Sequence, residues 1–100
     1  MTAEIEGFVR DAARKRGIDP DIVVRACKTE GGVDEYARLG DFSGPPWYSG
    51  KSWWSLQLHY GGPGYEHFGH TAGMGNGFSK LTGWAPGDPK AWRDSIRYAL

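Results

Sequence analysis

The chain of 100 residues contains a single cysteine, Cys27. One cysteine excludes a disulfide bond within the chain and a zinc site built on several cysteine ligands. Charge of one sign is not in excess either, because 12 basic residues balance 12 acidic residues. This balance, together with the lack of a basic stripe along the sequence, argues against a nucleic-acid partner held by electrostatic attraction.

Long hydrophobic runs are missing as well. The first 17 residues carry acidic side chains early and have no apolar core segment, so we expect neither a signal peptide nor a membrane span. A protein of this kind that acts outside the cytoplasm would need another delivery route. Repeats and low-complexity tracts are absent, and the length suffices for one modest core, so we expect a single domain over residues 1–100.

Glycine and large aromatic residues are abundant instead. The chain has 16 glycines, five tryptophans and 14% aromatic residues. Glycine-rich connections combined with large rings are typical of a loop-rich domain with a ligand groove. A plain helix bundle would need fewer of both.

Two amphipathic patterns at the start of the chain predict helices. Thr2 can cap the first helix, and Gly17 ends it. Asp19 and Pro20 open the second helix, which Gly31 and its neighbour break. The predicted inward stripe of the first helix is Ile5, Phe8, Val9, Ala12 and Ala13. The predicted inward stripe of the second helix is Val23, Ala26, Cys27 and Glu30.

Glu30 therefore falls at a helix carboxyl end, which is an unfavourable place for an anion. The negative end of the helix dipole and partial burial both destabilise the carboxylate, and both would raise its pKa. A carboxyl group with a raised pKa is suited to general acid catalysis near neutral pH. The alternative is a frayed helix end whose glutamate points into water, and the pattern alone leaves both open.

The helical period is lost between Val33 and Gly64. Residues 40–50 are rich in turn-forming pairs, and "WWSLQLHY" at 53–60 then alternates between apolar and polar positions. The alternation predicts a half-buried strand that forms one arm of a small hairpin, with a short helix as the alternative. The predicted inward residues are Trp54, Leu56, Leu58 and Tyr60. The predicted outward residues are Trp53, Ser55, Gln57 and His59.

The last third of the chain returns to helix. A glycine-rich connection spans 61–77, and 77–83 is predicted to form a helical turn. Asp88 caps a last helix that begins at Pro89 and buries Trp92, Ile96 and Ala99. Two helices, an irregular β lobe and further helix together predict an α+β fold that is mainly helical with a short irregular β-hairpin lobe.

Three groups of residues could carry chemistry. Glu30 and Asp41 are two carboxylates in different environments, as glycoside cleavage requires, although Asp41 could instead bond its own turn backbone. Aromatic rings with nearby polar groups suit sugars, and Trp47, Trp53, Tyr60, Ser55 and Gln57 are the candidate substrate-binding residues. Glu66, His67 and His70 suggest a metal, but Gly69 interrupts the pattern and no third strong ligand pattern follows, so no metal or other cofactor is expected.

The chain resembles the lysozyme-like superfamily, specifically its soluble lytic transglycosylase-like and phage muramidase domains. The resemblance rests on "GIDPDIVVRACKTEGG", "SWWSLQLHYGG" and "GMGNGFSKLTGWAPGDPKAWRDSIRYAL", in this order from Gly17 onward. In that family a helix ends in the catalytic glutamate followed by a small residue, here Glu30 and Gly31. Gln57-Leu58 are similar to the end of the second motif. The family usually has glycine three residues before that glutamine, whereas this chain has Trp54.

The resemblance implies a small lysozyme-like fold that cleaves peptidoglycan between N-acetylmuramic acid and N-acetylglucosamine. Glu30 would be the acid and Asp41 the weaker second carboxylate, with Asp34 and Glu35 as substitutes for it. Gln57 and Tyr60 would hold the sugar. The implied partners are glycan strands and other phage virion proteins, and the implied location is the virion or the bacterial cell wall or periplasm. The alternative is a non-catalytic glycan-binding or structural tail module with the same fold.

Overall fold

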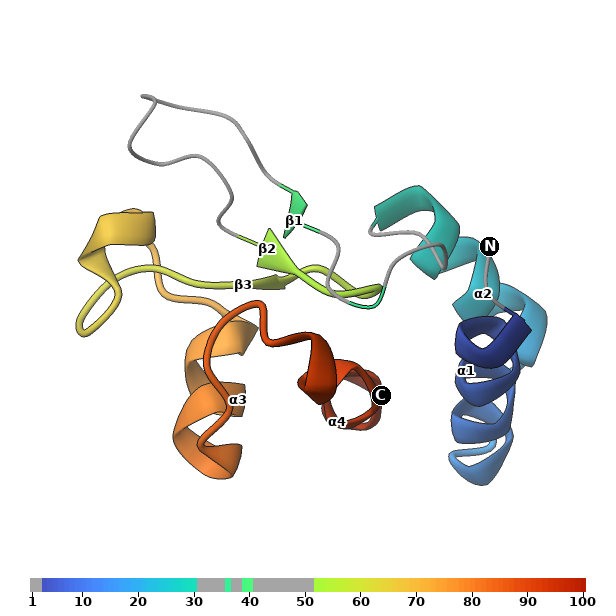
Figure 1. Ribbon diagram of the computed structural model, residues 1–100. Helices are drawn as coiled ribbons and strands as arrows, with labels where there is room; N and C mark the ends of the chain where they lie inside the picture. Colours follow the sequence, from blue (N-terminus) through green and yellow to red (C-terminus); the bar gives the residue numbers. More distant parts are fainter. Residues whose placement is uncertain (1–2, 31–35, 37–38, 41–51) are drawn as a thin grey trace.

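The computed structural model describes residues 3–30, 36, 39–40 and 52–100, with the backbone alone at positions 30, 39 and 40. The α-helices are α1 (Ala3–Lys15), α2 (Pro20–Glu30), α3 (Met74–Thr82) and α4 (Trp92–Ala99). Two 3-10 helices are η2 (Glu66–Phe68) and η3 (Pro89–Ala91), and the strands are β1 (Leu39–Gly40), β2 (Ser52–Trp53) and β3 (Leu58–His59). Figure 1 shows α1 and α2 on one side, α3 on the other, and α4 between them below the sheet. This arrangement confirms the predicted α+β class.

The first two helices form an antiparallel pair whose ends follow the predicted capping residues. Gly17 has a left-handed φ of 70°, and its N–H donates to the Arg14 carbonyl at 3.0 Å. The Asp19 carboxylate accepts the Asp21 N–H at 2.9 Å and so caps α2. An ion pair of 2.7 Å between Arg10 and Asp21 then joins the two helices.

The predicted stripe of α1 is confirmed, with Phe8 partly buried. That of α2 is wrong at Ala26, and its last member, the Glu30 side chain, lies outside the described residues. Ala26 is exposed, whereas Val24 is 3% exposed and takes its place beside Val23 and Cys27. The reason is that α1 packs against the side of α2 that carries Val23, Val24 and Cys27.

The strand predicted over 53–60 is wrong, because this segment contains a complete hairpin turn. The sheet has the order β1-β2-β3 with antiparallel pairs, and Trp53 pairs with Leu58. Residues 54–57 form the turn that links β2 to β3. Trp54 and Gln57 adopt left-handed φ values of 68° and 50°, which end the extended backbone on both sides of the turn.

The helix expected at 77–83 begins earlier, at Met74. Asn76 explains the earlier start, because its side-chain oxygen accepts the Gly73 N–H at 3.3 Å and its amide donates to the Gly61 carbonyl at 2.6 Å. At the other end of this region, the Asp88 carboxylate caps η3 as predicted, by accepting the Lys90 N–H at 2.9 Å. Pro89 therefore opens a 3-10 turn, and α4 itself starts at Trp92.

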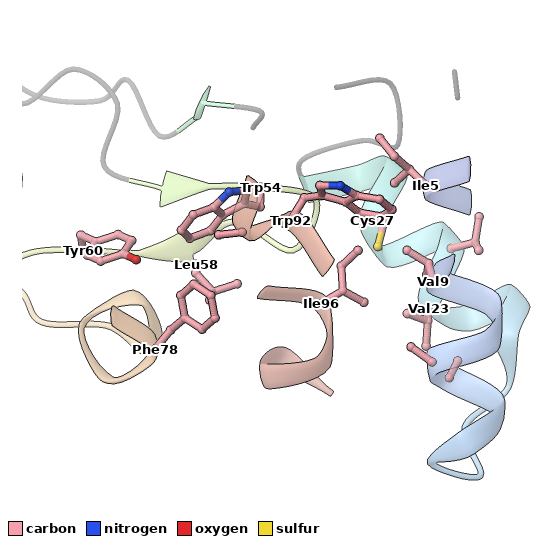
Figure 2. Packing of buried hydrophobic residues seen from close by; sticks show 14 residues of the cluster. Ile5, Val9, Val23, Cys27, Trp54, Leu58, Tyr60, Phe78, Trp92 and Ile96 are labelled. Atoms are coloured by element: carbon pink, nitrogen blue, oxygen red, sulfur yellow. The ribbon is translucent and has the colours of Figure 1, made fainter. Parts of the chain in front are cut away.

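Large aromatic rings link the parts of the core that joins these elements (Figure 2). Trp54 is fully buried, packs its ring at 5.2 Å from Phe78, and donates its indole N–H to the Asp88 carbonyl at 2.9 Å. Trp92 packs at 5.2 Å from Phe8 of α1. Figure 2 shows Trp92 between Trp54 and Cys27, so this ring connects the hairpin to the helix pair.

Candidate functional site

Glu30 is the last residue of α2, as the sequence predicts. In the turn of helix before it, Cys27 is fully buried, and burial raises the pKa of its thiol to about 11. Figure 1 shows this carboxyl end of α2 at the level of the three-stranded sheet, with the connection to α1 at the opposite end of the helix pair. The predicted side chains at Glu30, Asp34, Glu35, Asp41 and Trp47 lie outside the described residues.

The hairpin turn after β2 contains the second predicted position, Gln57. Its backbone N–H and its side-chain amide both donate to the Trp54 carbonyl, each at 3.0 Å. Two residues other than glycine thus hold left-handed φ values in a four-residue turn, at a cost of about 1–3 kcal/mol each. The buried Trp54 ring and the doubled hydrogen bond offset that strain, so the turn fixes Gln57 in one place.

Trp53 is the partly exposed aromatic residue of this hairpin. Its ring lies against Gly87, where a Cβ would approach a ring carbon to 2.6 Å. The indole Nε1 is buried and has no hydrogen-bond partner, the one such side-chain atom among the described residues. A buried donor without an acceptor costs about 1–3 kcal/mol. Because the atom is buried, a ligand carbonyl could reach this donor only if the packing around it moved.

Ser55 does not lie where the alternating pattern predicts, whereas Tyr60 faces inward as that pattern predicts. Ser55 is 3% exposed. It lies in the turn, where side chains do not alternate between the two faces as they would in a straight strand. Tyr60 is fully buried, and its hydroxyl bonds to the Ser79 hydroxyl at 2.6 Å. Burial raises the pKa of Tyr60 to about 12. Both residues belong to the buried part of this structure and present almost no exposed surface with which to hold a sugar.

The histidine-rich segment uses its side chains within the fold. The Glu66 carboxylate accepts the Gly64 N–H at 3.1 Å, and the His67 ring packs at 4.0 Å from the Phe68 ring. Hydrogen bonds from its own N–H and that of Gly64 lower the pKa of Glu66. In the part of the chain that the structure describes, no three His, Cys, Asp or Glu side chains gather as a metal site would require.

One hollow that the sequence did not indicate lies between α1 and η3 and has a volume of about 310 Å³. Tyr36 contributes a ring at 5.3 Å from Trp92 and donates its hydroxyl to Glu4 at 2.8 Å. Arg93 lies 4.5 Å from the centre of the Trp92 ring. No local pattern joins Tyr36 to residues more than 30 positions away, so only the tertiary structure could reveal this hollow. Its lining residues are Glu4, Tyr36, Pro89, Lys90, Trp92 and Arg93.

Within the described residues, no helix has the length and apolar character needed to cross a membrane. Comparison with known proteins finds no matching family model, no matching curated protein and no matching solved structure. Function must therefore be inferred from the residues and their geometry.

Proposed function

We propose that this chain is a small lysozyme-like domain that cleaves the glycan strand of peptidoglycan between N-acetylmuramic acid and N-acetylglucosamine. The observation that supports the proposal is the position of Glu30 as the last residue of α2, three residues after the fully buried Cys27. Glutamate at a helix carboxyl end is disfavoured as an anion, because the helix dipole opposes its charge. A carboxyl group in this position is suited to keep its proton until a glycosidic oxygen accepts it.

In the proposed reaction the Glu30 carboxyl group protonates the oxygen that links the two sugars, and the bond to the anomeric carbon breaks. Trp53 and Gln57 are the described candidates for holding the sugar. The Trp53 indole offers an apolar ring for a sugar face and an unpartnered N–H for an acetamido carbonyl. Gln57 offers an amide whose position is fixed by the strained turn.

The backbone of the hairpin also supports the resemblance on which the proposal draws. Trp54 replaces the glycine that the family usually has three residues before the motif glutamine. Its φ of 68° is a conformation that glycine adopts without strain. The turn thus keeps a glycine-like backbone, and the Trp54 ring is used in the core rather than in the groove.

Two routes can complete the cleavage. A hydrolase uses a second carboxylate, for which Asp41 is the first candidate, to activate water or to form a glycosyl-enzyme. A lytic transglycosylase needs only Glu30, which takes up the proton of the muramic acid 6-hydroxyl as this oxygen attacks the anomeric carbon. We favour the second route, because Glu30 has the stronger sequence pattern of the two carboxylates.

A non-catalytic glycan-binding module is the second candidate function, and the Trp53 ring with its unpartnered N–H favours it independently of Glu30. Purified peptidoglycan distinguishes the two. An enzyme clears the suspension and releases soluble muropeptides, whereas a binding module co-sediments with the wall and releases none. Binding without release would overturn the proposed activity.

A further inference from the structure

The connection between α3 and α4 contains a tight turn over residues 85–88. The Asp88 N–H donates to the Ala85 carbonyl at 3.2 Å, and Gly87 has a φ of 79°. Proline at the second position, here Pro86, and a positive φ at the third position match a type II turn. Such a turn accepts glycine or asparagine at its third position, so local rules alone do not require Gly87 to be glycine.

The Trp53 ring lies on this turn. A Cβ added to Gly87 would lie 2.6, 2.6 and 2.7 Å from Cε3, Cζ3 and Cδ2, three consecutive atoms of the six-membered ring of Trp53. A point nearly equidistant from three atoms of a six-membered ring lies over the centre of the ring and not beside its edge. Gly87 therefore covers one face of the Trp53 ring, at a distance that leaves no room for a Cβ.

The turn that carries Gly87 is held from two sides. The fully buried Trp54 donates its indole N–H to the Asp88 carbonyl at 2.9 Å, which joins the turn to the hairpin. The Asp88 carboxylate accepts the Lys90 N–H at 2.9 Å, which joins the turn to η3. Gly87 is thus a fixed support for the ring that lies on it.

Packing, and not a hydrogen bond, sets the orientation of the Trp53 ring. The indole Nε1 is buried without a hydrogen-bond partner, although Trp53 as a whole is partly exposed. Burial of an unpaired donor is unfavourable, so the contacts of the ring must outweigh that cost. Because Gly87 lies over the ring face, it is one of the contacts that hold the ring in this orientation.

We propose that Gly87 is a positioning residue that orients the Trp53 ring for a sugar. The inference rests on the proposed function, in which Trp53 stacks on the glycan strand. Gly87 itself touches the ring and not the substrate. Because Gly87 covers one face, Trp53 accepts a single sugar ring, on its opposite face.

Substitution of two glycines by asparagine tests the proposal. Gly83 is the matched control, because it has a φ of 81° at the end of α3 and an added Cβ there meets nothing within 4 Å. Asparagine tolerates both backbones, but only at position 87 does the new side chain meet the Trp53 ring. Gly87→Asn should weaken co-sedimentation with purified peptidoglycan at least about fivefold and leave kcat at saturating substrate unchanged. Gly83→Asn should change neither.

Two further measurements separate ring orientation from general damage. The NMR signal of the Trp53 indole N–H, identified by its loss in Trp53→Phe, should shift in Gly87→Asn and not in Gly83→Asn. In a Trp53→Ala background, Gly87→Asn should cause no further loss of peptidoglycan binding, because the ring that it displaces is gone. Gly87→Ala adds the Cβ alone and should show the same pattern, with Gly83→Ala as its control.

Equal effects of the two asparagine variants, an unchanged Trp53 indole signal, or a further loss in the Trp53→Ala background would overturn the positioning role of Gly87. A parent chain that neither binds nor cleaves peptidoglycan would refute the proposed function itself. A parent chain that binds peptidoglycan and is insensitive to Gly87→Asn would refute this inference alone.

Discussion

In the proposed cleavage Glu30 is the acid, and a nearly isosteric exchange tests this role. Glu30→Gln should preserve the fold and reduce the release of muropeptides at least about a hundredfold, because glutamine has no proton to transfer. Glu66→Gln is the matched control, since this exposed glutamate lies on η2. Near-parental activity of Glu30→Gln at an unchanged melting temperature would rule out this residue as the acid.

The raised pKa values of Cys27 and Tyr60 predict how the stability of the fold changes at alkaline pH. Burial raises the pKa of Cys27 from 9.0 to about 11 and the pKa of Tyr60 from 10.0 to about 12. Raised pKa values mean that folding favours the protonated forms. The stability that these two groups contribute is therefore fully present below pH 9 and is lost as the pH rises through 11 and 12. The combined loss is several kcal/mol, at about 1.4 kcal/mol per pH unit for each group.

Thermal unfolding between pH 7 and pH 11 measures this loss. The melting temperature should begin to fall above pH 9, where the unfolded Cys27 thiol ionises. Cys27→Ala removes this group, lowers stability at every pH because of the lost packing, and should delay the further decline to about pH 10. A variant whose decline starts at the same pH as the parent would show that the thiol is not responsible.

At the scale of an element, substitution by alanine should have opposite effects on stability at two glycines of the α1 region. Gly17 has a φ of 70°, so Gly17→Ala should destabilise the protein by about 1–2 kcal/mol. Gly7 lies inside α1, and an added Cβ there meets nothing within 4 Å, so Gly7→Ala should stabilise by about 0.5–1 kcal/mol. Urea unfolding measures both, and effects of the same sign would refute the capping role of Gly17.

Variants at Gln57 separate the backbone strain of the hairpin turn from a role of the Gln57 side-chain amide in substrate binding. Gln57→Gly and Gln57→Ala both remove the side-chain donor, but only glycine relieves the φ of 50°. The glycine variant should therefore be about 1 kcal/mol more stable than the alanine variant. If the amide holds substrate, both variants should raise KM for peptidoglycan by a similar factor, at least about fivefold. An unchanged KM would assign Gln57 a purely structural role.

For the whole molecule, the chemistry of the released ends distinguishes the two routes of cleavage. Mass spectrometry of muropeptides should detect anhydromuramic ends if the one-carboxylate route operates, and reducing ends if water is the nucleophile. In the first case Asp41→Asn should keep most of the activity. In the second it should reduce activity at least about a hundredfold. A folded but inactive Asp41→Asn variant would overturn the one-carboxylate route.

The sequence by itself determined the features that depend on neighbours along the chain. Helix starts and stops follow from capping groups a few residues away, so Asp19, Gly17 and Asp88 could be assigned correctly. The end of α2 at Glu30 is of the same kind, because the glycines after it cannot extend the helix favourably. The α+β class follows from the same local patterns.

The tertiary structure decided what depends on residues far apart in sequence. The Asp88 carbonyl accepts the Trp54 N–H and helps to stabilise the turn that replaced the predicted strand. The Ser79 hydroxyl, 19 residues away, draws Tyr60 into the core rather than to the groove. The hollow at Tyr36 brings together Glu4 of α1 and Trp92 of α4, and no period within either helix contains that information. Local patterns encode element ends, whereas burial depends on which neighbours fold over each face.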